Sequence, residues 1–178
     1  MATPETAALP LIRPAREEDA VSLREIFNEA VQDGLATFDA EPRSLDEQRR
    51  LLASATQTPQ HSILVAELRG WVAGWIILQG HDLRPQLADI GEVSVFVRRD
   101  FRKFGVGRQL MQAMQREAGR LGWRKLIGFV LAENTDSLRL CRACGWREAG
   151  RLEQHIRRGS GWRDAIVVEY VVSPTPVL

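Results

Sequence analysis

The segment "IGEVSVFVRRDFRKFGVGRQLMQAM" (residues 90–114) decides the fold, because it passes from a strand to a helix through a loop that contains two glycines. Residues 90–97 are rich in branched and aromatic side chains, as strands are. From Leu110 onward, apolar side chains recur at helical spacing. Gly105 and Gly107 lie where backbone N–H groups can close on an anion, toward which the following helix directs its positive end.

Basic residues surround this loop. Between residues 98 and 108, five basic side chains face one acid, Asp100; the five are Arg98, Arg99, Arg102, Lys103 and Arg108. The functional interpretation is a site for a polyanionic ligand, and the alternative is a turn eased by glycine with a solvated basic rim. The third glycine of a dinucleotide fingerprint and the G-K-[ST] of a Walker loop are both absent. Dehydrogenase and phosphotransferase functions are therefore disfavoured.

The flanking sequence predicts an α+β domain with a mixed, mostly antiparallel central sheet flanked by helices. Before the loop, periodicity and turn signals indicate a strand at 11–15, helices within 16–34 and at 44–54, and largely antiparallel strands at 62–68, 70–80 and 90–97. After the loop's helix come a buried strand at 125–132, a short helix at 135–144 and a hairpin formed by 145–158 and 163–172.

Length and composition limit the function classes. A chain of 178 residues suits one domain, which we expect at 11–172 between a disordered segment 1–10 and a flexible tail 173–178. The net charge of +1 argues against general binding of nucleic acid or a membrane surface. No apolar run approaches the roughly 20 residues of a membrane span, and no signal peptide is recognisable, so we expect a cytoplasmic protein. The three histidines are widely separated, and no metal site is expected.

Three segments in this order resemble the GCN5-related N-acetyltransferases, or GNAT superfamily. They are "VSVFV" (93–97), the loop 102–107 and "NTDSLRLCRACGW" (134–146). The resemblance covers 11–172, and "ATFDAEP" (36–42), "LRP" (83–85) and "GWRDA" (161–165) are similar to the branch of phosphinothricin and methionine-sulfoximine acetyltransferases. It implies the GNAT fold, acetyl-CoA as cosubstrate, and direct transfer to a small amino-acid-like amine in a ternary complex.

The resemblance also implies a cofactor site. Main-chain groups of Val95, Phe96 and Val97 would run along the pantetheine arm, with the Val95 N–H near the thioester oxygen, where a backbone donor stabilises an oxyanion. Asn134 would contact the same arm. The pyrophosphate would be held by Arg102, Lys103, Phe104, Gly105, Val106, Gly107 and Arg108. From the residues alone, Val95 and Val97 equally suit a hydrophobic core.

Glu92 takes the position of the proposed base in this branch. On a strand, Glu92, Ser94 and Phe96 share one face. A partly desolvated carboxylate there can have a raised pKa and take a proton from an ammonium group. The alternative is a solvated carboxylate, or one paired with a surface arginine.

The resemblance assigns the acceptor to residues near "ATFDAEP" and "LRP", namely Phe38, Glu41 and Arg84. Arg84 could bind a substrate carboxylate through two hydrogen bonds, although an exposed loop arginine is an equal interpretation. The branch usually has an aromatic residue shortly after this arginine, where this chain has residues 86–88, "QLA". That departure leaves the particular substrate open.

Cys141 and Cys144 form a C-x-x-C spacing at the end of the predicted short helix. Redox pairs stand at helix N-termini, where the dipole stabilises a thiolate, so this placement disfavours redox chemistry. We expect Cys144 to be a core residue. By the resemblance, Cys141 takes the place of a tyrosine or histidine near the CoA sulfur and could return a proton to the leaving thiolate.

Two other functions remain open at this stage. The acceptor could be a protein N-terminus or lysine, or the chain could be a non-enzymatic module that binds acyl-CoA. The resemblance also implies a homodimer, for which the C-terminal hairpin could supply the interface.

Overall fold

The computed structural model describes residues 9–81 and 84–172, which form one seven-stranded sheet in the order β1-β2-β3-β4-β5-β7-β6. The strands are β1 (Leu11–Pro14), β2 (Ser62–Leu68), β3 (Trp71–Gly80), β4 (Ile90–Val97), β5 (Lys125–Leu131), β6 (Arg147–Arg158) and β7 (Gly161–Val171). The helices are α1 (Ala20–Asp33), α2 (Leu45–Gln57), α3 (Val106–Arg120) and α4 (Thr135–Ala143). Neighbouring strands pair antiparallel except β4 and β5. The predicted α+β class is confirmed.

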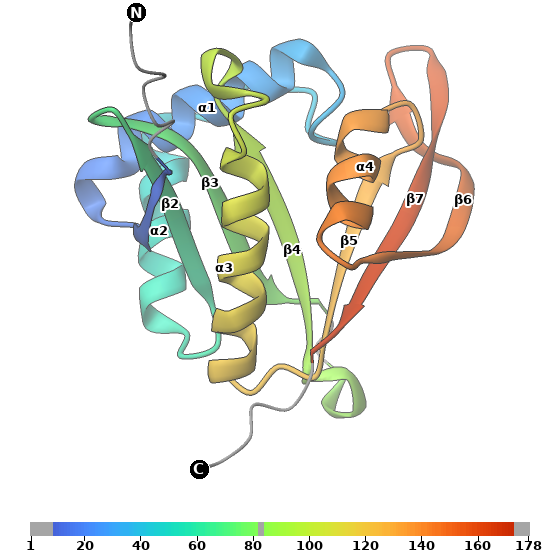
Figure 1. The fold of residues 1–178 in the computed structure, drawn as a ribbon. Helices are drawn as coiled ribbons and strands as arrows, with labels where there is room; N and C mark the ends of the chain where they lie inside the picture. The colour runs from blue at the N-terminus through green and yellow to red at the C-terminus, as the bar shows by residue number, and fades with distance from the viewer. Residues whose placement is uncertain (1–8, 82–83, 173–178) are drawn as a thin grey trace, which may run out of the picture.

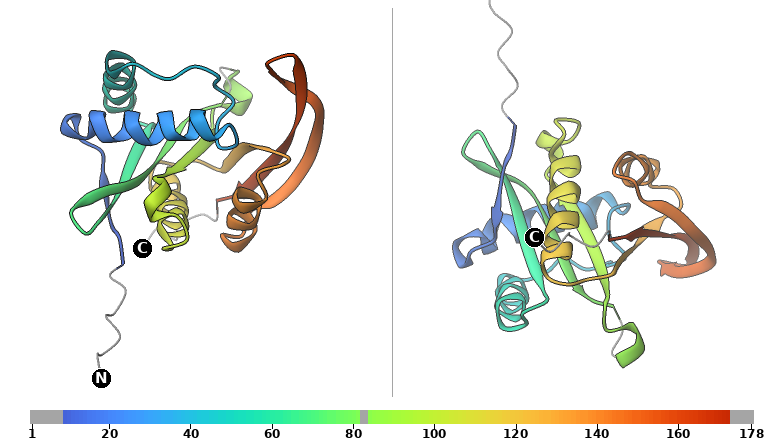
Figure 2. Two further views of the ribbon diagram at one scale, coloured as in Figure 1. Left: turned by 90° about the horizontal axis from the view of Figure 1, so that it is seen from above. Right: turned by 60° about the horizontal axis from the view of Figure 1, so that its bottom comes forward.

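The helices cover the two faces of the sheet in pairs (Figures 1 and 2): α1 and α2 lie on one face and α3 and α4 on the other. The buried face of α1 is the one that its spacing predicts, and it consists of Ala20, Leu23, Ile26, Phe27, Ala30 and Val31. Gly34 ends this helix at a φ of 70°, a left-handed conformation that costs glycine little. Each face of the sheet thus has its own apolar cluster.

The predicted turns and caps are also present. Ser44 and Glu47 form the expected capping box at the start of α2. Arg69 and Gly70 join β2 to β3 with φ values of 54° and 78°, as a two-residue hairpin turn requires. The predicted disorder of 1–10 and of the tail 173–178 falls almost entirely outside the described residues.

The parallel pair β4 and β5 separates along its length. The two strands pair from Ile90 with Lys125 to Glu92 with Ile127, whereas β4 continues to Val97 and β5 to Leu131. Figure 1 shows the strands meeting at one end and diverging toward the other. Within the described chain, the edge of β4 from Val93 onward therefore has no strand partner on the side of β5. Unpaired backbone groups at such an edge can bind an extended ligand.

The loop after β4 leads directly into α3. A short 3₁₀ turn spans Arg99–Phe101, and Gly105 then caps α3 at a φ of 79°. This places the start of α3 beside the diverging end of β4. Of the helices within 9–81 and 84–172, none has the length and apolar character needed to cross a membrane.

Candidate active site

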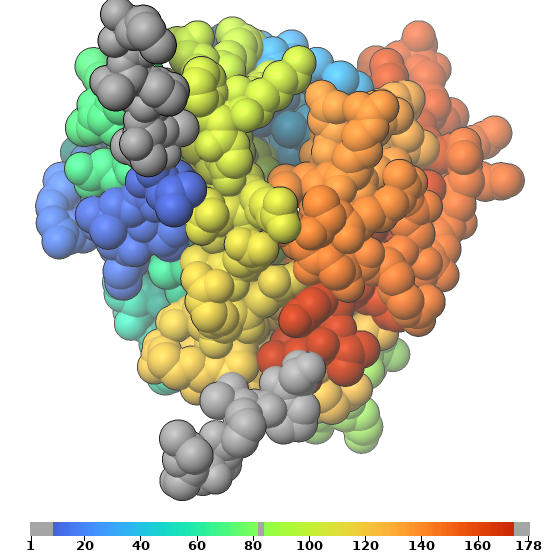
Figure 3. Space-filling view, in the orientation of Figure 1, coloured from blue at the N-terminus to red at the C-terminus, as the bar shows by residue number. Residues whose placement is uncertain are grey.

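A cavity of about 360 Å³ opens where β4 and β5 diverge. Most of its lining comes from β3, β4, β5 and α4, with single residues from α1, α2, α3 and β7. Residues 35–39 and Arg43, between α1 and α2, close one side. Figure 3 shows the molecular surface hollowed between α3 and α4. Two hydrogen bonds fix residues 35–39: the Asn134 side chain donates to the Leu35 carbonyl (2.9 Å), and Arg158 donates to the Asp39 carbonyl (3.1 Å).

Six of the residues expected from sequence line this cavity: Phe38, Glu92, Val95, Phe96, Asn134 and Cys141. The loop residues 102–108 and Val97 lie outside the lining, next to it along the chain. Glu41 and Arg84 are exposed and are also absent from the lining. The structure thus gathers the expected catalytic residues but places only Phe38 of the expected acceptor residues in the cavity wall.

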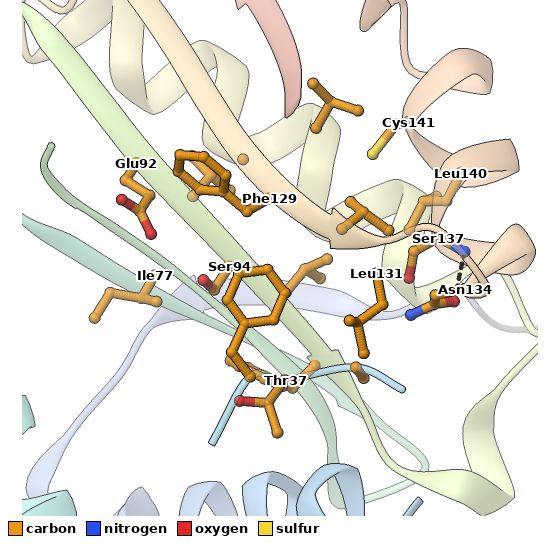
Figure 4. A pocket seen from close by; sticks show the side chains of 18 of the residues that line it. Thr37, Ile77, Glu92, Ser94, Phe129, Leu131, Asn134, Ser137, Leu140 and Cys141 are labelled. Atoms are coloured by element: carbon orange, nitrogen blue, oxygen red, sulfur yellow. Dashed lines mark hydrogen bonds between the residues drawn. The ribbon is translucent and has the colours of Figure 1, made fainter. Parts of the chain in front are cut away.

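Glu92 projects from β4 with 31% of its side chain exposed. Figure 4 shows Glu92 and Ser94 on this strand, while Ser137, Leu140 and Cys141 come from α4 on another side of the pocket. The predicted alternation along β4 is confirmed, because Phe96 packs with the α1 and α2 cluster whereas Val93 belongs to the α3 and α4 cluster. Glu92 therefore faces the side of the sheet that residues 35–39 cover.

His81 is a partner of Glu92 that the sequence did not reveal. Its Nδ1 lies 3.0 Å from Glu92 Oε2, and its ring centroid lies 5.9 Å from that of Phe129. The hairpin register brings them together, since Gly80 pairs with Gly91 and the His81 N–H donates to the Ile90 carbonyl. The contact between His81 and Glu92 could have been predicted only from the register in which β3 pairs with β4. The carboxylate is thus paired with an imidazole.

The basic stretch after β4 is partly neutralised by α1. Arg98 pairs with Glu25 (2.8 Å), and Arg99 and Arg102 both pair with Asp33 at 2.7 Å. Burial would raise the pKa of Asp33, but hydrogen bonds from these two arginines outweigh it and lower that pKa. The local excess of positive charge is therefore smaller than the sequence suggests, because the acids come from residues more than sixty positions earlier.

Two basic side chains near the start of α3 are exposed and can bind an anion. Lys103 and Arg108 are exposed, and neither has an ion pair within residues 9–81 and 84–172. Lys103 and Gly105 have φ values of 68° and 79°, so the chain turns sharply before the helix. A Cβ at Gly107 would lie 3.0 Å from Leu140 Cδ2, so this glycine also lets α3 pack against α4. The loop can present backbone N–H groups and two cations to an anion.

Asn134 joins the cavity wall to α4. Its Oδ1 accepts a hydrogen bond from the Ser137 N–H (3.1 Å), which caps α4 (Figure 4), while its Nδ2 donates to Leu35. Both ends of the amide are therefore used in the protein itself. One N–H of Nδ2 and one lone pair of Oδ1 remain for a ligand.

Both cysteines are buried free thiols at the C-terminal end of α4. Cys141 lines the cavity, and burial raises the pKa of its thiol to about 11, with Cys144 and Glu148 adding to the effect. Burial also raises the pKa of Cys144, which packs in the α3 and α4 cluster as predicted. Burial therefore keeps both thiols protonated near neutral pH.

Several lining residues were not foreseen: Arg43, Gln79, Ser94, Phe129 and Ser137. Strand alternation placed Ser94 on the face of Glu92 but assigned it no role. The position of Arg43 in the cavity could not be predicted from its neighbours in sequence, because they indicate only the cap of α2. Within the described residues, no group of three acidic, histidine or cysteine side chains could hold a metal ion.

Comparison with known proteins relates this site to acetyl transfer. A family model described as an acetyltransferase (GNAT) domain matches residues 11–147. The chain is 31% identical over 140 residues to YwnH of Bacillus subtilis (strain 168), provisionally named a phosphinothricin acetyltransferase, and the match covers 78% of this chain and 85% of that protein.

Two solved structures have the same fold. The ribosomal-protein-alanine N-acetyltransferase of Brucella melitensis has a TM-score of 0.87 at 29% identity, with 90% of this chain and 99% of that one covered. A GNAT superfamily phosphinothricin acetyltransferase of Sinorhizobium meliloti, in complex with acetyl-CoA, also has a TM-score of 0.87, at 24% identity and with 95% of each chain covered.

Proposed function

Because this chain belongs to the GNAT family of acetyl-CoA-dependent N-acetyltransferases, we propose that it acetylates the amine of a small amino-acid-like acceptor of the phosphinothricin or methionine-sulfoximine type. The observation that carries the proposal is the cavity between the diverging strands, which brings the unpaired edge of β4 and the carboxylate of Glu92 to one space. The residues present suit acetyl-CoA, since an exposed strand edge and a cationic helix start match an extended arm and its pyrophosphate.

In this proposal two neighbouring segments bind the cofactor: the end of β4 and the loop that leads into α3. Lys103, Arg108 and the N–H groups at the start of α3 hold the pyrophosphate, with residues 102–107 shaping the loop. The main chain of Val95–Val97 pairs with the pantetheine arm, which Asn134 also contacts. Direct transfer then takes place with the cofactor and the acceptor bound together.

Glu92 acts as the base. Its carboxylate takes a proton from the acceptor ammonium, and His81, 3.0 Å from Oε2, orients the carboxylate. The neutral nitrogen attacks the thioester carbonyl carbon, and a C–N bond forms. The Val95 N–H stabilises the oxyanion. As the carbonyl reforms, the C–S bond breaks, the thiolate leaves, and the nitrogen's remaining extra proton passes to it or to solvent.

In this scheme Cys141 does not transfer its proton to the leaving thiolate. An ordinary thiol has a pKa of about 8.5, and the pKa of Cys141 is raised to about 11. A full proton transfer from Cys141 to the CoA thiolate would therefore be uphill. A hydrogen bond from the Cys141 thiol to the departing sulfur needs no such transfer.

Cys141→Ala is accordingly expected to lower kcat by less than about tenfold, because one weak hydrogen bond is lost, with the KM for acetyl-CoA changed little. Steady-state kinetics with a saturating acceptor would measure this effect. The matched variant Cys144→Ala removes the neighbouring buried thiol outside the cavity and controls for packing. A hundredfold loss confined to Cys141→Ala would identify Cys141 as the essential acid.

The function itself is tested by thiol release from acetyl-CoA over a panel of amines. The panel contains phosphinothricin, methionine sulfoximine, common amino acids, and peptides with free N-termini. We expect turnover with at least one free amino acid and acetylation at its amine by mass spectrometry. Turnover with peptides alone would favour a protein acceptor, as the name of the Brucella neighbour suggests. Tight CoA binding without turnover would indicate a binding module.

The proposal extends to a cytoplasmic homodimer. The exposed Trp162, at the end of the β6 and β7 hairpin, supports an interface there, since large aromatic side chains are enriched at interfaces. Sedimentation of the wild type and of Trp162→Ala would test it, and a monomeric wild type would contradict it.

A further inference from the structure

Arg43 is a partly buried cation in the cavity wall that has no part in the proposed mechanism. It lies just before α2, and its side chain is only 21% exposed. The guanidinium carbon lies 3.7 Å from the centroid of the Phe27 ring, and Nη1 donates to Gln48 Oε1 (3.1 Å). Its backbone N–H and carbonyl both bond to the side chain of Asn28. Contacts from α1 and α2 thus hold the guanidinium in place.

The charge of Arg43 is incompletely balanced. In the described part of the chain, its one ion pair is with Asp39 at 3.8 Å, and the Asp39 side chain is 60% exposed. Burial lowers the pKa of Arg43, and the carboxylates of Asp39 and Glu47 offset that effect only in part. A buried charge without a close counter-ion is costly. An anion that entered the cavity would therefore find a fixed and poorly compensated partner.

Arg43 lines the same cavity as the base. Phe27, under the guanidinium, packs 5.4 Å from Phe96, which in turn packs 4.7 Å from Trp75. Phe96 follows Glu92 by four residues on the same face of β4, which is about 13 Å along the strand. Ser94 lies between them. An acceptor whose amine is at Glu92 can thus extend past Ser94 toward Phe96 and the Arg43 head group.

We propose that Arg43 binds an anionic group of the acceptor and so makes acids preferred over neutral amines. This inference rests on the proposed function and names the acceptor class: an amino-acid-like amine whose side chain ends in a carboxylate or a similar acid. A guanidinium can bind such a group through two parallel hydrogen bonds. Because the α-carboxylate is attached beside the amine, the group that can reach Arg43 is an acid at the far end of the acceptor's side chain.

The test compares acids with their amides as acceptors. L-Glutamate is measured against isoglutamine, which lacks the α-carboxylate, and against glutamine, which lacks the side-chain acid. For the wild type we expect kcat/KM to be about 10- to 100-fold higher for glutamate than for glutamine, the usual effect of one charge-assisted hydrogen-bonded contact. A preference seen only between glutamate and isoglutamine would contradict the inference, because it would depend on the α-carboxylate beside the amine.

Variants separate binding from folding. In Arg43→Met the preference is expected to fall to nearly one, while Arg43→Lys recovers part of it and the KM for acetyl-CoA is unchanged. Arg49→Met is the matched control, because Arg49 lies on α2 with 53% of its side chain exposed and pairs with Asp46. Asp39→Asn is expected to lower the KM for the acid, since it removes a competing carboxylate, and a merely damaged fold would not do so.

The inference is wrong if Arg43→Met turns over both members of each pair with the wild-type preference, or if the wild type has no preference for an acid. Calorimetric binding of the same pairs to the CoA-bound protein measures the preference without turnover. A wild type that binds the acids through Arg43 but acetylates no amine would refute the proposed function alone. A wild type that acetylates acids and amides equally would refute this inference alone.

Discussion

Glu92→Gln is expected to lower kcat/KM for the amine acceptor by about 10²- to 10⁴-fold, the usual contribution of a positioned general base. The amide has the shape of the carboxylate and can still hydrogen-bond His81, which lies 3.0 Å from Oε2, but it cannot take a proton. Because Glu92 does not hold the cofactor in this scheme, the dissociation constant of acetyl-CoA should stay the same. Steady-state kinetics and titration with acetyl-CoA measure the two quantities.

The pH dependence sharpens this test. At higher pH more of the acceptor amine is already neutral, so the deficit of Glu92→Gln relative to the wild type should shrink. Glu67→Gln is the matched control, since it makes the same change on β2 at a side chain that is 37% exposed and pairs with Arg13. Wild-type turnover by Glu92→Gln at neutral pH would show that another group, or water alone, takes the proton.

Gly105→Ala is expected to weaken acetyl-CoA binding by about 10- to 100-fold. Gly105 caps α3 at a φ of 79°, where alanine is strained by roughly 1–2 kcal/mol. Relief of that strain would rotate the neighbouring N–H groups away from the point at which they converge on a phosphate. The KM for the acceptor should change little, because residues 102–108 lie outside the cavity lining.

Gly122→Ala provides the control for strain. Gly122 follows the other end of α3 at a φ of 84°, and a Cβ at either glycine would meet no atom within 4 Å. Both variants should therefore lose a similar free energy of unfolding, measured by thermal or urea denaturation. Equal loss of acetyl-CoA affinity in the two would mean that strain, and not the phosphate loop, causes the effect.

Local structure could be predicted well because its causes lie within a few residues. The six apolar residues that face inward from α1 follow the helical period. The Ser44 and Glu47 cap and the Arg69–Gly70 turn each depend on side chains or φ angles inside one turn of chain. The same holds for Glu92, Ser94 and Phe96, which share a face because strands alternate.

The candidate site was foreseen in part. The resemblance identified Phe38, Glu92, Asn134 and Cys141, all of which line the cavity. It did not indicate His81 or Arg43, since their importance depends on the pairing of β3 with β4 and on how the connection before α2 folds over α1. Short-range patterns contain no information on such contacts.

The sequence by itself determined the order of helices and strands, their buried faces, their caps and the family to which the chain belongs. Only the tertiary structure decided that β4 and β5 part after Glu92, that α1 neutralises three arginines of the basic stretch, and that Arg43 lies in the cavity with little compensation. The physical reason is the distance along the chain over which each effect acts. Periodicity and capping act over a few residues, whereas the balance of a buried charge depends on every group that folding brings near it.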